Sequence, residues 1–181
     1  MTKMEPSDNA KFFEHGCVSI ENRDFQNRLV CLRVCMPCCL FQAITPSLLG
    51  QGFIDKLSIR SPVSIWLPRL TKERLNSLGG QIDSIDHHVN LLLKQKAEET
   101  LKLFQEISQI LNDPSDIIPI VPMGVYIEFQ YRCKIDNMLE LLASVEKTPV
   151  VGVYEFQWAL ASVLHCILED LNRWDRSNHK S

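Results

Sequence analysis

The sequence lacks the long runs and motifs that identify many classes of protein. It has no stretch of about twenty uninterrupted apolar residues, so no membrane-spanning helix is expected. It also lacks a glycine-rich phosphate-binding loop, a Gly-x-Ser-x-Gly nucleophile motif and a His-Glu-x-x-His zinc motif. From these absences we expect a protein that is not an enzyme and that carries no cofactor.

The sequence also lacks a large excess of positive or negative charge. The 181 residues include 19 lysines and arginines against 22 aspartates and glutamates, for a net charge of −3, and no long basic run occurs. Sequence-independent binding to nucleic acid needs a face that neutralises phosphates, so nucleic acid is not an expected partner. With 45% hydrophobic and 23% charged residues, the composition is typical of a globular chain.

The seven cysteines form an odd set, so at least one of them has no partner within the chain. Residues 1–16 are polar and mixed in charge, without the apolar core of a secretory signal. Free thiols persist in reducing compartments. We therefore expect the protein in the cytosol or the nucleus.

One long amphipathic helix is predicted over residues 71–112, between Pro68 and Pro114. Its first apolar stripe follows steps of three and four residues, and consists of Leu75, Leu78, Ile82, Ile85, Val89 and Leu92. The phase then slips, as at a coiled-coil stutter, to a second stripe of Leu93, Ala97, Thr100, Phe104, Ile107 and Leu111. A helix with such stripes needs another element to pack against, because helices owe most of their stability to tertiary packing.

Two further helices are predicted near the C-terminus, over residues 135–146 and 153–174. The last one has apolar residues on more than half of its circumference, including Phe156, Leu160, Ile167 and Trp174. A helix this apolar is either central to a bundle or covered by another protein. Short strands are predicted from alternating residues at 17–20, 29–35, 57–60, 63–67, 117–121 and 125–132.

These elements predict a predominantly α-helical fold. The long coiled-coil-like helix packs with the two C-terminal helices, and a few short strands are attached. Along the chain we expect a loose N-terminal leader at 1–16, a small cysteine-containing and partly β region at 17–68, and a helical domain at 69–181.

The densest group of possible metal ligands is the cluster from Cys31 to Cys39. Zinc takes four thiolate or imidazole ligands, often as two short-spaced pairs. Such pairs are present here as Cys35 with Cys38 and His15 with Cys17. The spacing matches no standard zinc finger. Cysteines of this kind more commonly serve as small buried hydrophobes, and acylation or redox chemistry is a third alternative.

The triplet Asp86-His87-His88 matches the metal-binding triplet of the Asp-His-His phosphoesterases. Those enzymes also need upstream aspartate motifs in an α/β core, which this sequence lacks. Because the triplet lies inside the predicted long helix, a solvated helix face is the preferred interpretation.

The function predicted from the sequence is that of a non-enzymatic subunit or adaptor in a multiprotein complex. It would bind protein partners, or itself, through coiled-coil or helix-in-groove contacts. The predicted contact residues are Leu75, Leu78, Ile82, Ile85, Val89, Leu92, Phe156, Leu160, Ile167 and Trp174. The alternative is a zinc-stabilised nucleic-acid-binding or regulatory module that uses the Cys31–Cys39 cluster.

Overall fold

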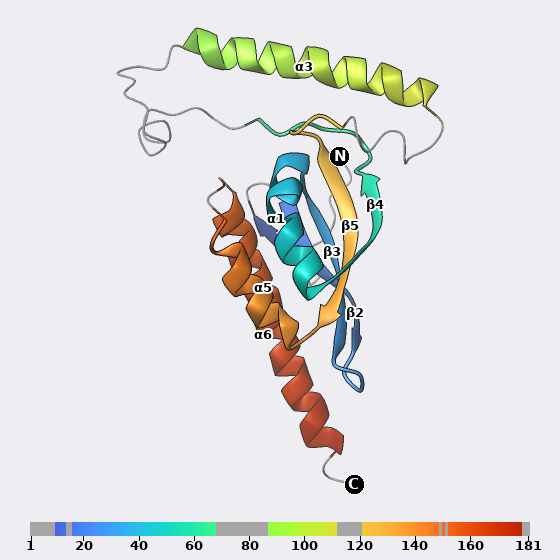
Figure 1. Cartoon of the computed structure of the whole chain (residues 1–181), viewed down its shortest axis with the longest axis vertical. Helices are drawn as coiled ribbons and strands as arrows, with labels where there is room; N and C mark the ends of the chain where they lie inside the picture. The colour runs from blue at the N-terminus through green and yellow to red at the C-terminus, as the bar shows by residue number, and fades with distance from the viewer. Residues whose placement is uncertain are drawn as a thin grey trace.

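The computed structural model describes residues 10–13, 16–67, 87–111, 121–148, 150 and 152–178. Its elements are β1 (Ala10–Phe13), β2 (Gly16–Asp24), β3 (Leu29–Pro37), α1 (Cys38–Gln51), β4 (Gly52–Ile59), α3 (His87–Ile110), β5 (Tyr126–Lys134), α5 (Asn137–Val145) and α6 (Val153–Asn178). Figure 1 shows a sheet with α1, α5 and α6 packed beside it, and α3 lying across one end of the molecule.

The prediction of a predominantly α-helical fold is wrong. Among the described residues, five strands form one antiparallel sheet in the order β1-β2-β3-β5-β4, and four helices accompany it. The alternating residues at 29–35 and 125–132 do form strands, as predicted. Their spacing in the sequence does not show that they pair with each other, and this pairing is what makes the sheet the centre of the fold.

The position of β5 joins distant parts of the chain. β5 lies between β3 and β4 and pairs with both of them. The expected partly β region, 17–68, and the expected helical domain, 69–181, therefore share one sheet. β1 extends the same sheet from within the expected leader, 1–16, by pairing with β2.

The sheet has one apolar and one polar face, because successive side chains of a strand point to opposite sides. The apolar face of the two central strands consists of Val30, Leu32, Val34, Met36, Ile127, Phe129, Tyr131 and Cys133, all buried. α1, α5 and α6 pack on this face and complete the core. The polar face carries alternate residues of the same strands, such as Arg33 and Arg132.

Helix α1 was not predicted, because Pro46 falls inside it. Proline removes a helical hydrogen bond and disfavours a helix interior. Leu40, Ile44 and Leu48 nevertheless follow a spacing of four residues and are all buried. Their burial outweighs the local cost of the exposed proline.

Helices α5 and α6 confirm the two predicted C-terminal helices, but the apolar face of α6 is turned inward. Phe156, Leu160 and Ile167 are buried in the core of the chain itself. Their assignment to a partner-binding surface is therefore corrected, because these side chains already cover the sheet. Trp174 is partly exposed, and its ring packs at 6.2 Å between centroids from that of Phe25.

Helix α3 lies within the predicted helix 71–112, of which residues 71–86 and 112 lie outside the described part. The second predicted stripe is the one that faces the protein. Ala97 and Phe104 are buried and Ile107 is half-buried, whereas Leu93 and Thr100 of this stripe are exposed.

Candidate functional site

Two cysteines meet on the polar face of the sheet near the start of β2. Cys17 and Cys35 are directly opposite each other in the antiparallel pairing of β2 with β3, and their thiols are hydrogen-bonded. Gly16 makes this approach possible, since a Cβ atom at this position would lie 2.0 Å from the carbonyl oxygen of Cys35. The two thiols are therefore held together by the register of two paired strands.

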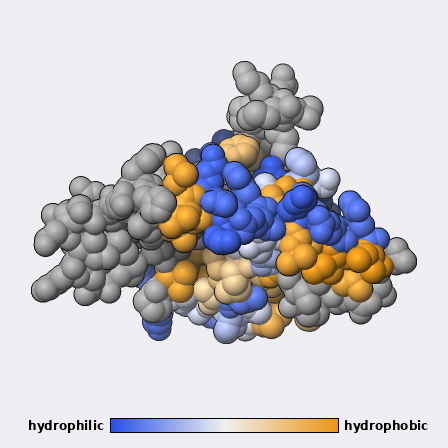
Figure 2. Space-filling view, turned by 90° about the horizontal axis from the view of Figure 1, so that it is seen from above, coloured by the Kyte–Doolittle hydropathy of each residue, from blue (hydrophilic) through white to orange (hydrophobic). Residues whose placement is uncertain are grey.

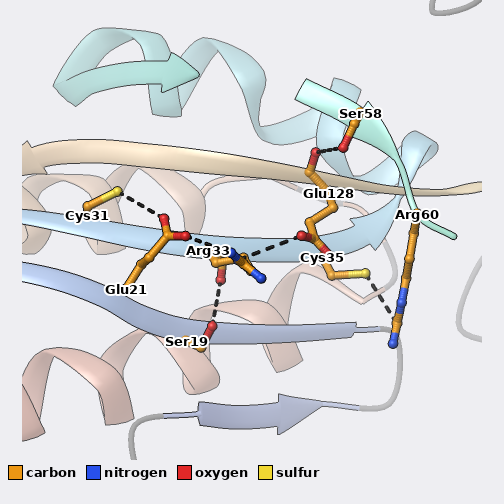
Figure 3. Close-up of polar contacts among 8 residues, drawn as sticks. All are labelled: Ser19, Glu21, Cys31, Arg33, Cys35, Ser58, Arg60 and Glu128. Carbon is orange, nitrogen blue, oxygen red and sulfur yellow. Dashed lines mark hydrogen bonds and ion pairs between the residues drawn. The ribbon is translucent and has the colours of Figure 1, made fainter. Parts of the chain in front are cut away.

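Arg60 brings a positive charge to this pair, and Figure 3 shows its side chain beside the sulfur of Cys35. Its Nη1 donates to the sulfur of Cys35 over 3.3 Å. Its backbone N–H donates to the carbonyl oxygen of Tyr126 over 3.0 Å, which ties the end of β4 to β5. The guanidinium is thus fixed beside the two sulfurs by main-chain contacts as well as by its side chain.

The surroundings of the two thiols make them chemically different. The hydrogen bond from Cys35 lowers the pKa of Cys17 to about 7, and the charge of Arg60 acts in the same direction, while burial and the charge of Glu128 oppose the shift. The pKa of Cys35 is raised, because its thiol donates that hydrogen bond and because it is buried. The pair therefore loses its first proton more readily from Cys17 than from Cys35.

Cys17 is also the thiol that a reagent can reach. An open cavity of about 560 Å³ is lined by Phe12, Gly16, Cys17, Arg60, Pro62, Ser64 and Tyr126. Cys35 is not one of these lining residues and is buried. A small molecule that enters the cavity meets the Cys17 sulfur and the Arg60 guanidinium.

A network of charged side chains continues along the same face (Figure 3). Arg33 pairs with Glu21 over 2.7 Å and approaches Glu128 over 3.7 Å. Glu21 also accepts a weak hydrogen bond from the thiol of Cys31 over 3.5 Å. This carboxylate and burial raise the pKa of Cys31, with burial the larger cause, so Cys31 is less prone to ionise than Cys17.

Beside this network lies a second cavity, of about 440 Å³, between β2 and β4. Irregularities in both strands flank it, at Glu21 and at Lys56, and both side chains line the cavity. Gln130 lines its floor, and its buried Oε1 has no hydrogen-bond partner among the described residues. The cavity therefore offers the Glu21 carboxylate, the Lys56 ammonium group and the unpaired Oε1 of Gln130 to a small polar molecule.

The predicted zinc ligands are only partly brought together. Cys17 and Cys35 meet as described, but Cys38 begins α1 and belongs to the apolar core. His15 lies outside the described residues. Within the described ranges, no group of three or more histidine, cysteine, aspartate or glutamate side chains is placed to hold a metal ion.

Most of the predicted contact residues at the start of the long helix cannot be placed. Leu75, Leu78, Ile82 and Ile85 lie outside the described residues, as does Asp86 of the Asp-His-His triplet. The backbone of His87, His88 and Val89 forms the first turn of α3. Leu92, the last residue of the first stripe, is 43% exposed.

The outer face of α3 continues the first stripe. Leu103 is 57% exposed and Ile110 is 76% exposed. Steps of eleven and seven residues, from Leu92 to Leu103 to Ile110, bring side chains back to within about 20° of one direction on a helix. We call these three residues, together with Lys96 and Glu99 between them, the outer seam of α3.

The sequence placed Cys17 and Cys35 in one predicted set of zinc ligands, but their direct pairing and the contact with Arg60 were not predicted, although part of the signal was present. Alternation in residues 29–35 places Cys31, Arg33 and Cys35 on one strand face, opposite the buried valines. The partner strand and its register came only from the structure.

Among the described helices, none combines the length and the apolar character needed to cross a membrane. Comparison of the chain with models of known protein families and with curated proteins finds no match.

Proposed function

We propose that this protein is a non-enzymatic subunit or adaptor that assembles through helix–helix contacts along the outer seam of α3. The observation that carries this proposal is the exposure of Leu92, Leu103 and Ile110 on one side of a 24-residue helix. A separate stripe of the helix, at Ala97 and Phe104, is already buried. Exposed apolar residues at heptad-like spacing are typical of a surface that pairs with another helix.

The charges in the seam favour a second copy of this chain as the partner. The residues Leu92, Lys96, Glu99 and Leu103 follow steps of four, three and four, which read the same in both directions. In an antiparallel pair of α3 helices, Leu92 of each copy therefore lies opposite Leu103 of the other. In the same register Lys96 lies opposite Glu99 of the partner copy.

The two kinds of contact have different roles. Apolar contact between the leucines supplies the attraction, at roughly 25 cal/mol for each Å² of apolar surface removed from water. Exposed ion pairs contribute only about 0–1 kcal/mol each, so Lys96 and Glu99 chiefly set the orientation. Within one copy Lys96 and Glu99 already pair over 2.7 Å, and dimerisation would share these charges between the copies.

Sedimentation equilibrium of the full chain over a wide range of concentrations tests the proposal. We expect a monomer–dimer equilibrium for the wild type, and a monomer for Leu103→Glu at every concentration. The matched control is Leu91→Glu, since Leu91 is on the same helix and 55% exposed but lies off the seam. A wild type that stays monomeric, or a folded Leu103→Glu variant that dimerises as the wild type does, would contradict the proposal.

Charge reversal tests the register. Lys96→Glu alone and Glu99→Lys alone each place like charges opposite one another in a dimer of that variant, so both are expected to dimerise more weakly. Mixing the two variants restores opposite charges at both contacts. We expect the mixture to dimerise more strongly than either variant alone, and equal association of the mixture and the single variants would exclude the antiparallel register.

The proposal keeps the cytosol or nucleus as the expected location, because all seven cysteines are free. The sequence carries no catalytic motif, which supports a binding role rather than an enzymatic one.

A further inference from the structure

The paired thiols on the polar face are placed as a reactive cysteine and its resolving partner. We infer that Cys17 and Cys35 form a peroxide-responsive thiol pair, in which a hydroperoxide oxidises Cys17 and Cys35 then closes a disulfide across β2 and β3. This site is independent of the outer seam of α3, and it adds a chemical activity to the proposed binding role.

The register allows the bond to form with little movement of the backbone. Directly opposed residues in antiparallel strands have Cα atoms about 4.5–5.5 Å apart. Disulfides span Cα distances of about 4.4–6.8 Å. Cys17 and Cys35 are Cα partners in this register, and their thiols are already hydrogen-bonded.

The division of roles follows from access and charge. Thiolates are the nucleophiles in thiol oxidation, and redox-active cysteines are accessible and lie in electropositive surroundings. Cys17 lines the open cavity together with Arg60. Cys35 is buried and in contact with Cys17, which suits the second step and not the first.

The reaction balances with a hydroperoxide as oxidant. The Cys17 thiolate attacks the terminal peroxide oxygen, the O–O bond breaks, and the leaving oxygen takes a proton and departs as water or an alcohol. Cys17 is then a sulfenic acid. The Cys35 sulfur attacks the Cys17 sulfur, the S–O bond breaks, and hydroxide leaves with the Cys35 proton as water. The two sulfurs lose two electrons in total, and the peroxide gains them.

Four of the five other described cysteines are poorer candidates for the first step. Burial raises the pKa of Cys38, of Cys39 and, to about 12, of Cys133. Cys31 is on the same face as Cys35, but burial and the carboxylate of Glu21, to which its thiol donates, raise its pKa. The pair is therefore expected to react in preference to these four thiols.

The test is oxidation of the folded full-length protein with equimolar hydrogen peroxide, followed by non-reducing tryptic mapping with fragmentation spectra. Fragmentation is needed because Cys35, Cys38 and Cys39 share one tryptic peptide. We expect a Cys17–Cys35 disulfide that a dithiol reductant reverses. A folded protein that forms no such link, or that links Cys17 to the other cysteines equally, would overturn the inference.

Variants separate the two steps. Cys35→Ser is expected to trap Cys17 as a sulfenic acid, which dimedone labels, whereas Cys17→Ser should give neither label nor disulfide.

Arg60→Gln is expected to slow the alkylation of Cys17 by iodoacetamide severalfold near pH 7, because the thiolate fraction falls. Cys31→Ser is the matched control on the same strand face and should behave as the wild type. Folding of each variant is checked by circular dichroism. If dimedone labels Cys31 in preference to Cys17, the assignment of the reactive thiol is wrong.

Discussion

Cys17 and Tyr131 show how single residues in this protein depend on neighbours that are distant in the sequence. The thiolate of Cys17 is stabilised by Cys35 of β3 and by Arg60, the residue that follows β4. The hydroxyl of Tyr131 lies in the core and donates to the carbonyl oxygen of Leu48 over 3.1 Å. Each contact predicts a measurable property of the folded state.

The pKa of Cys17 predicts a pH dependence of stability. Between pH 7 and about 8.5, the ordinary thiol pKa, the folded protein has released the Cys17 proton but the unfolded chain has not. Stability therefore rises with pH in this window, and the contribution is lost as pH falls through 7. We expect the difference in free energy of unfolding between wild type and Cys17→Ser to grow from pH 6 to pH 8, measured by urea denaturation. A difference that is constant over this range would show that the folded thiol has an ordinary pKa.

The buried hydrogen bond of Tyr131 predicts a stability loss. Tyr131→Phe removes the donor and leaves the ring in place, so the free energy of unfolding should fall by about 1 kcal/mol. Tyr154→Phe is the control, because Tyr154 is exposed and its variant should match the wild type. Chemical denaturation measures both, and equal stability of the two variants would mean that the buried bond makes no net contribution.

At the scale of elements, α3 and α6 have similar apolar stripes, but the stripes lie in different surroundings. The stripes of α6 cover the sheet, whereas the stripes of α3 are divided between an inner side at Ala97 and Phe104 and an outer seam at Leu103 and Ile110. Periodicity predicts that a helix has an apolar side. It does not tell which neighbour covers that side, because the neighbours come from distant parts of the chain.

The orientation of α6 predicts opposite outcomes at adjacent positions. Ile167→Ala creates a cavity between α6 and the sheet and should lower the free energy of unfolding by about 2–5 kcal/mol. Leu168→Ala, on the partly exposed side of the same helix, should cost less than about 1 kcal/mol. Thermal or urea denaturation checks the pair, and similar losses would show that the assigned core face is incorrect.

At the scale of the whole molecule, β5 holds the fold together. It supplies the partner of β3 on one side and of β4 on the other. Without β5, β4 has no neighbouring strand in the sheet, and the apolar face of β3 loses the residues that continue it.

A fragment of residues 1–67 is therefore predicted not to fold alone. It contains β1 to β4 and α1 but lacks β5. We expect a far-ultraviolet circular dichroism spectrum of an unfolded chain and amide proton resonances with little dispersion. A well-dispersed spectrum from this fragment would mean that the N-terminal region is a domain in its own right.

The sequence by itself determined the local elements with strong periodicity: the strands at 29–35 and 125–132, and the helices at 135–146 and 153–174. Each of these depends on alternation or on steps of three and four within one segment. The tertiary structure alone decided that α1 forms despite Pro46, that the strands join into one sheet, and that α6 is buried. It also decided that Cys17 meets Cys35 and Arg60. These outcomes depend on pairing between strands that are far apart along the chain, and no spacing within one segment encodes that pairing.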